Sequence, residues 1–129
     1  MDFGVFCSAV VGPRPWEESE PERFRQDLEM GIKADEVGFD SFFAPEHHFL
    51  EEYSHNAASH LTCLAVGMRT ERIRLVTGIM NLCAPINHPV RVAEQIAMID
   101  IYTNGRIELG TGRGSGSTEV NSWGLRNEE

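Results

Sequence analysis

Apolar segments with the length of buried strands alternate with helical patterns along the chain, and this alternation limits the fold more than any other feature. Four short runs rich in branched or aromatic residues predict strands at 3–11, 39–44, 73–80 and 107–110. Their near-continuous hydrophobicity is typical of strands buried on both faces of a parallel sheet. A strand and its helix together repeat about every 35 residues, as in successive βαβ units.

Three helical patterns separate these strands. The first has the spacing of a capping box at Ser19 and Glu22 and is expected to end at Gly38. The third is expected to begin at Pro89 and to end at residues 104–105. The apolar residues that recur with helical spacing are Phe24, Leu28 and Ile32 in the first helix, Leu61, Leu64, Ala65 and Met68 in the second, and the inward-facing Val92, Ile96 and Ile99 in the third.

Two α/β architectures accommodate this order of elements. One is a doubly wound open sheet, and the other is part of a (β/α)8 barrel. A complete barrel needs about 250 residues, so the length of 129 residues favours the open sheet. The motifs at the strand ends favour half of a barrel. The polar stretch 112–129 is expected to be a loop that reaches the end of the chain before its helix.

Composition narrows the possible partners and the compartment. The chain has 11 Lys and Arg against 20 Asp and Glu, a net charge of -9, which disfavours binding to nucleic acid and to anionic membranes. Cys7, Cys63 and Cys83 have no paired spacing, as expected of reduced thiols. An export signal and a membrane-spanning apolar run are both missing, so the sequence predicts a cytoplasmic protein.

Residues with useful chemistry follow the second predicted strand, in the sequence PEHHF at 45–49. Adjacent side chains that leave a strand point in roughly opposite directions, so at most one of His47 and His48 is expected to face a central pocket. An imidazole there could act as a general base or hydrogen-bond donor, and Glu46 could orient it or bind a cation. The alternative is that both histidines cap strand ends or pair with loop carbonyls.

Glycines mark the ends of the third and fourth predicted strands. Gly78 could let a flat ligand approach the main chain, or it could form a plain bulge. At 110–117 alternate glycines expose backbone amides, and Arg113 supplies a planar cation suited to phosphate, although a flexible loop is an equal alternative. The spacing matches neither a dinucleotide fingerprint nor a Walker loop.

A metal site is not predicted. The chain has five histidines, but they form neither a His-x-His pair after the first strand nor a His-Glu-x-x-His pattern on a helix. His88, directly before Pro89, is interpreted as a residue of the helix start rather than as a catalyst.

Taken in order, the motifs resemble those of the bacterial luciferase-like flavin-dependent monooxygenases. The matching segments are EHHF at 46–49, RIRLVTG at 72–78, HPVRVAEQ at 88–95, Asp100, NGR at 104–106, LGTGRG at 109–114, Glu119 and WG at 123–124. The resemblance covers the whole chain. It implies the N-terminal half of a (β/α)8 barrel, with about four β/α units in a single incomplete domain at 1–129 that is truncated after the fourth strand.

The resemblance also implies an activity. Family members use reduced FMN and oxygen to oxidise a small organic substrate, and a separate reductase supplies the reduced flavin. One alternative within the superfamily is hydride transfer with F420, and another is a non-catalytic flavin-binding module. A metal-dependent barrel hydrolase is a third alternative. A half barrel exposes strand edges, so a homo-oligomer or self-association is expected as well.

Site residues follow from the same resemblance. It places His47, with Glu46 as a second catalytic candidate, beside the reactive part of the flavin. It places Gly78 and Ile79 at a bulge, often with a cis peptide, that meets the flavin ring. Arg113 is expected to reach toward the phosphate, flanked by Gly112 and Gly114 in the cofactor-binding loop. Light-emitting members carry a reactive cysteine where this chain has Gly112, so light emission from an aldehyde is not expected.

Overall fold

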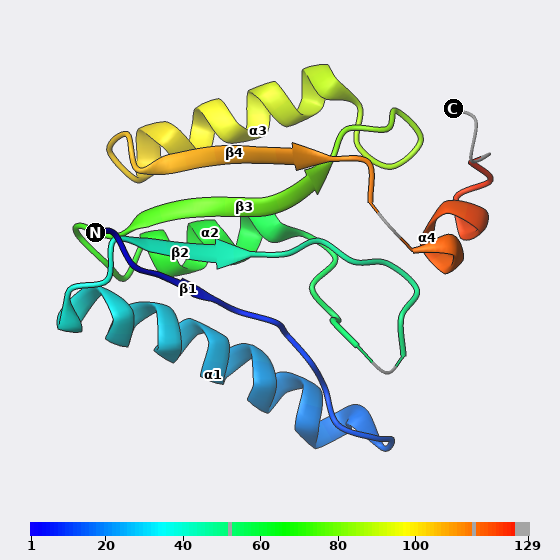
Figure 1. Ribbon diagram of the computed structural model, residues 1–129, viewed down its shortest axis with the longest axis horizontal. Helices are drawn as coiled ribbons and strands as arrows, with labels where there is room; N and C mark the ends of the chain where they lie inside the picture. Colours follow the sequence, from blue (N-terminus) through cyan, green and yellow to red (C-terminus); the bar gives the residue numbers. More distant parts are fainter. Residues whose placement is uncertain (52, 115, 126–129) are drawn as a thin grey trace.

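Strands and helices alternate along the folded chain, as the sequence predicts (Figure 1). The computed structural model describes residues 1–51, 53–114 and 116–125. Its elements are β1 (Gly4–Phe6), α1 (Trp16–Val37), β2 (Ser41–Ala44), α2 (Ser59–Gly67), β3 (Arg74–Asn81), α3 (Pro89–Tyr102), β4 (Ile107–Gly112) and α4 (Ser117–Ser122).

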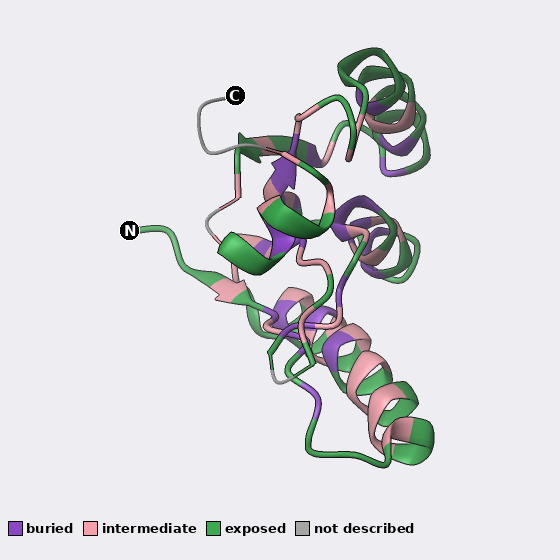
Figure 2. Ribbon diagram, turned by 90° about the vertical axis from the view of Figure 1, so that its right-hand side faces the viewer, coloured by how far each residue is buried: buried purple, intermediate pink, exposed green. Residues whose placement is uncertain are grey.

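The four strands form one parallel sheet in the order β1-β2-β3-β4. Seen from the carboxyl ends of the strands, α1, α2 and α3 all cover the same face (Figure 2). A doubly wound sheet would reverse its strand order and carry helices on both faces, whereas sequential strands with helices on one face are the arrangement of a (β/α)8 barrel. The structure therefore confirms the half-barrel prediction over the open sheet.

The core lies between this sheet and its helices. Phe42 and Leu75 pair in register across β2 and β3 and are fully buried, and Val66 of α2 packs in the same cluster. Gly67 allows α2 to approach this closely, because a Cβ atom there would lie 2.6 Å from the Leu75 Cδ1 atom. Of the inward residues predicted for α3, Val92 and Ile99 are buried, and Ile96 packs against the core cluster.

Two predictions about the amino-terminal part were wrong. Helix α1 begins at Trp16, so Ser19 lies inside the helix and its buried hydroxyl makes no capping hydrogen bond. Pro15 takes the extended conformation before the helix, and the acidic Glu17 and Glu18 favour its first turn electrostatically. The first strand is also shorter than expected, because the chain leaves the ladder after Cys7.

Helix α2 and the last segment also differ from expectation. In α2 the inward residues include Cys63 and Val66, whereas Leu61 and Met68 are more than half exposed. Small residues face the sheet here because the helix packs so close to it. The segment after β4 contains the short helix α4 where only a loop was expected.

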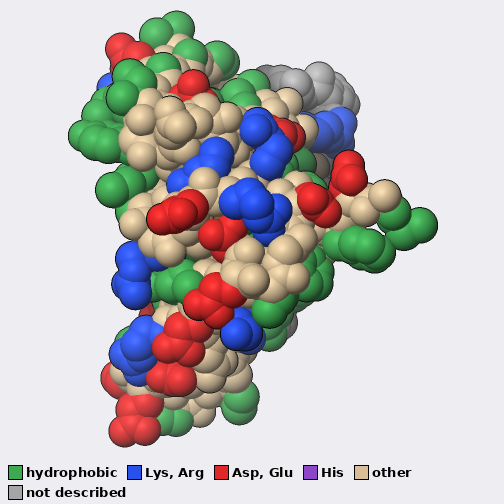
Figure 3. Space-filling view, turned by 90° about the vertical axis from the view of Figure 1, so that its left-hand side faces the viewer, with side chains coloured by type: hydrophobic (Ala, Val, Ile, Leu, Met, Phe, Trp, Pro, Cys, Tyr) green, Lys and Arg blue, Asp and Glu red, His purple; other side chains and the backbone are tan. Residues whose placement is uncertain are grey.

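Charged side chains hold the turns at the amino ends of the strands. On this face of the molecule, acidic and basic side chains are intermixed (Figure 3). The Asp35 carboxylate accepts hydrogen bonds from the backbone N–H groups of Glu71, Arg72 and Ile73. Burial by itself raises the pKa of Asp35, but these hydrogen bonds together hold it below its ordinary value. The Arg106 guanidinium donates to carbonyl oxygens of Gly67, Thr70, Ile73 and Thr103 and to the Thr70 hydroxyl.

Within the described residues, β1 and β4 each pair with a strand on one side only. Open edges of this kind promote pairing between chains, so we predict that the 129-residue chain expressed by itself self-associates. Leu109→Lys places a charge on the β4 edge and should shift sedimentation-velocity profiles toward monomer. Met68→Lys adds the same charge at the exposed residue that follows α2 and should not have this effect. A monodisperse wild-type monomer would contradict the prediction.

Candidate functional site

The carboxyl ends of β2, β3 and β4 open into one pocket of about 300 Å³. Its lining residues are Phe6, Pro45, Glu46, His47, Gly78, Ile79, Gly112, Arg113, Gly114 and Glu119. The structure thus brings together every residue that the sequence analysis selected as catalytic or cofactor-binding. Phe6 and Glu119 join them without a role having been predicted for either.

The two adjacent histidines point in different directions. His47 lines the pocket, and the edge of its ring packs against Tyr53 with the ring centroids 5.1 Å apart. The His48 side chain turns instead toward Glu46 and Trp123, with its Nε2 atom 3.3 Å from Glu46 Oε1. This confirms the prediction that only one of the two histidines faces the pocket.

Glu46 connects the segment after β2 with the end of β3 and with the segment before α3 through its buried carboxylate. Its Oε1 atom accepts hydrogen bonds from the Asn81 backbone N–H at 3.2 Å and from Asn87 Nδ2 at 2.8 Å. The carboxylate contacts His48 rather than His47, so the contacts of Glu46 are those of an anchor between loops. No local sequence pattern distinguishes Asn81 and Asn87, because both act through a residue more than 30 positions away.

Two consecutive residues of β3, Gly78 and Ile79, line the pocket. The peptide bond between Gly78 and Ile79 is cis, as the family resemblance implies, and the pairing of β3 with β4 shifts register here. Gly112 lies against Ile79, and a Cβ atom at Gly112 would come within 3.3 Å of the Ile79 side chain. Gly110 leaves even less room, because a Cβ atom there would overlap the Thr77 carbonyl oxygen. Gly112 is the residue of β4 that lines the pocket, and it brings no side chain into it.

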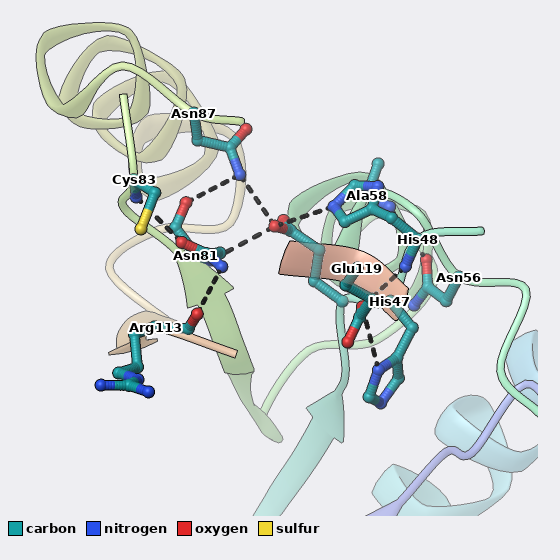
Figure 4. A network of polar contacts seen from close by, with 10 residues as sticks. His47, His48, Asn56, Ala58, Asn81, Cys83, Asn87, Arg113 and Glu119 are labelled. Atoms are coloured by element: carbon teal, nitrogen blue, oxygen red, sulfur yellow. Dashed lines mark hydrogen bonds and ion pairs between the residues drawn. The ribbon is translucent and has the colours of Figure 1, made fainter. Parts of the chain in front are cut away.

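Arg113 and Gly114 form the rim. The Arg113 carbonyl oxygen accepts a hydrogen bond from Asn81 Nδ2 at 2.9 Å, which fixes the loop to the end of β3. Its guanidinium is exposed and extends away from the polar network (Figure 4). Gly114 has a φ of 75°, a conformation that other residues rarely adopt. The loop is thus held in place while its cation stays free to meet an anion.

Glu119 reaches back from α4 to the histidine segment. Its Oε1 atom accepts a hydrogen bond from the His48 backbone N–H at 2.8 Å and lies 3.4 Å from His47 Nδ1. Glu119 is one of the residues that resemble the family, but no role was predicted for it, because a contact across 71 positions leaves no local signal.

Two other observations bear on alternative sites in the described ranges. No three His, Cys, Asp or Glu side chains there are grouped so that they could hold a metal ion. None of the helices described is both long enough and apolar enough to cross a membrane. A larger groove of about 560 Å³ lies between α1 and α2, but apolar residues such as Phe24, Leu28 and Leu61 line much of it.

Comparison with known proteins gives a consistent result over the whole chain. The sequence model of the family described as luciferase-like monooxygenase matches residues 1–129. The alkanal monooxygenase alpha chain of Photobacterium leiognathi is 30% identical over 129 residues, which are 100% of this chain and 35% of that protein. The chain therefore spans about a third of the length of this curated relative.

Solved structures with the same arrangement include two monooxygenases. The monooxygenase RslO1 from Streptomyces bottropensis superposes with a TM-score of 0.89 at 32% identity, covering 100% of this chain and 38% of that one. The oxygenating constituent of 3,6-diketocamphane monooxygenase from Pseudomonas putida, solved in complex with FMN, gives a TM-score of 0.86 at 25% identity, covering 98% and 33%.

A buried histidine beneath the site generates a pH prediction. Burial lowers the pKa of His60 below its ordinary value, more than the Glu46 carboxylate raises it. Below about pH 6.5 the unfolded chain therefore binds a proton that folded His60 resists. The contribution of neutral His60 to the free energy of unfolding is complete above about pH 6.5 and is lost as the pH falls. Urea unfolding should show wild type losing up to about 1 kcal/mol more than His60→Gln between about pH 7.5 and 5.5.

His88→Asn provides the control, because His88 is exposed and asparagine preserves a side-chain acceptor at the start of α3. This variant should follow the wild-type pH dependence. Equal pH dependence in wild type and His60→Gln would contradict the assignment to His60.

Proposed function

Because the chain belongs to the luciferase-like monooxygenase family, we propose that it supplies the amino-terminal half of a flavin-dependent monooxygenase. The complete protein would use reduced FMN and oxygen to oxidise a small organic substrate. Oxygen chemistry consumes the reduced flavin, so a separate reductase would restore it. The FMN-bound relative from Pseudomonas putida supports FMN as the cofactor.

One observation carries this proposal: the ends of three consecutive strands meet at a single pocket that His47, several glycines and the cationic Arg113 line together. The residues present fit a flavin. Gly78 and Gly112, which line the pocket without side chains, leave room for a flat ring, and the Arg113 guanidinium suits the phosphate. The open side of the pocket would be closed by the part of the barrel that this chain does not cover.

Each group of the chain then has a defined task. The flavin supplies the redox chemistry, and the protein positions it and excludes water. Arg113 and the neighbouring backbone N–H groups would bind the phosphate. His47 would accept or donate a proton next to the ring, since an imidazole changes protonation near neutral pH. Glu46 would hold the loops in register rather than contact the cofactor.

The phosphate assignment is tested by comparing FMN with riboflavin, which lacks the phosphate. Charge-assisted hydrogen bonds contribute about 1.5–3 kcal/mol, so we expect the wild-type chain to bind FMN roughly tenfold or more tightly than riboflavin. Fluorescence quenching measures both affinities, which should be weak without the remaining barrel strands. Arg113→Gln should remove the difference between the two ligands.

Arg91→Gln is the matched control, because Arg91 is an exposed α3 residue paired with Glu94. It should retain the preference for FMN. A wild-type chain that binds both ligands equally would contradict the phosphate site. Preferential quenching of F420 would favour the hydride-transfer alternative, and tight FMN binding without any oxidase turnover in the complete protein would favour a flavin-binding module.

The proton-transfer assignment is tested in a protein with the complete barrel. His47→Ala there should lower turnover by about 10²–10⁴-fold, the usual contribution of general acid–base catalysis. Flavin affinity should change far less, since Gly78, Ile79 and Arg113 would hold the flavin without His47. Steady-state kinetics and flavin titration of the same variant give the two values, and equal losses in both would argue against the role of His47.

A further inference from the structure

Glu119 is a buried acidic side chain that contacts both histidine residues of the segment after β2. Only 7% of its surface is exposed. Its Oε1 atom holds the His48 backbone N–H at 2.8 Å and approaches His47 Nδ1 to 3.4 Å. Glu119 belongs to α4, and its carboxylate lies beside the histidine segment that follows β2 (Figure 4).

The His47 Nδ1 atom is buried, and within the described residues it forms no hydrogen bond of good geometry. The carboxylate of Glu119 is the acceptor that lies beside it, at an ion-pair distance rather than an ideal hydrogen-bond distance. An ionised carboxylate can only accept a proton. A buried nitrogen facing it is therefore stabilised when it carries the hydrogen, and destabilised when it presents a lone pair.

The two nitrogens of a neutral imidazole cannot both carry a hydrogen. If Nδ1 carries it, Nε2 is left as a proton acceptor. The His47 and Tyr53 rings pack against each other in a T-shaped arrangement. The His47 ring lies with Nδ1 toward Glu119, and the opposite edge of the ring points away from that carboxylate (Figure 4).

We propose that Glu119 is a positioning residue that holds neutral His47 in the Nδ1–H tautomer, so that Nε2 is the atom that takes up a proton. The inference deepens the proposed function, on which its catalytic meaning rests. It also gives the connection after β4 two tasks, because Arg113 on the rim and Glu119 in α4 belong to the same βα segment. The same segment would then bind the phosphate and set the protonation of the histidine.

If the role of Glu119 were purely structural, a different tautomer of His47 would be expected. The hydrogen bond to the His48 backbone N–H alone would hold the segment in place, and it would leave the tautomer of His47 free to follow the intrinsic preference of histidine for Nε2–H. The tautomer therefore separates the two roles, whereas stability and overall activity do not.

Solid-state ¹⁵N NMR of the full 129-residue chain, labelled at its histidines, reads the tautomer directly and tolerates self-association. At about pH 8 histidines of ordinary pKa are neutral. The His47 signals are assigned by their loss in His47→Asn. His88 is an internal reference for the opposite tautomer, because its Nδ1 atom accepts a hydrogen bond from the Val90 N–H.

We expect Nδ1 of His47 to show the shift of a protonated nitrogen and Nε2 that of a bare one. Glu119→Gln should shift the population toward Nε2–H, because the amide can donate to Nδ1, and Glu119→Asp should retain more of the wild-type pattern. Glu20→Gln is the matched control: Glu20 lies 2.8 Å from His55 Nδ1, so this change should alter His55 and leave His47 unchanged.

A wild-type spectrum with His47 in the Nε2–H form would overturn the proposal without any variant. So would a folded Glu119→Gln chain in which the His47 signals are unaltered. The NMR sample contains no flavin, so the tautomer of His47 tests the role of Glu119 separately from the proposed function. If the tautomer is as expected and FMN is not bound, the monooxygenase proposal fails while the positioning role of Glu119 stands.

Discussion

The buried carboxylate of Glu46 is the interaction on which the site depends. An ionised group removed from water is costly unless hydrogen bonds compensate it. Here the donors are the Asn81 main chain and the Asn87 side chain, with His48 beside them, and they come from the ends of β2 and β3 and from the segment before α3. The compensation is therefore obtained only when these segments are in register. Because Asn81 also holds the Arg113 carbonyl, the β4 loop is fastened to the same point.

The two ends of the sheet have different roles, because one holds stabilising contacts and the other holds the pocket. At the amino ends, Asp35 and Arg106 use their charges to satisfy backbone groups of the turns, which fixes the packing of α1, α2 and α3 against the strands. At the carboxyl ends, the polar groups surround an open pocket and leave the Arg113 guanidinium exposed. This is the usual division in barrels of this type, in which stability gathers at one face and chemistry at the other.

Periodicity was sufficient to predict the elements and their order, because buried strands and helices that cover them leave strong local patterns. Periodicity was insufficient where a contact between residues far apart in the sequence determines the local structure. The inward face of α2 is set by the close approach of Gly67 to Leu75, not by its most apolar stripe. The start of α1 at Trp16 follows from Pro15, whereas the capping pattern at Ser19 was a coincidence of spacing.

For the site, the strand-end positions and the family resemblance led to His47, Gly78 and Arg113. The contacts of Asn87 with Glu46 and of Glu119 with the His48 main chain left no local pattern, since each joins residues distant in sequence.

The central claim is that loops after β2, β3 and β4 form one flavin site. A crystal structure of the chain with FMN tests it most directly. We expect the flavin ring to lie against Gly78 and Ile79 with His47 at its edge and the phosphate on Arg113. Electron density for the ring in the apolar groove between α1 and α2, with the strand-end pocket empty, would contradict it.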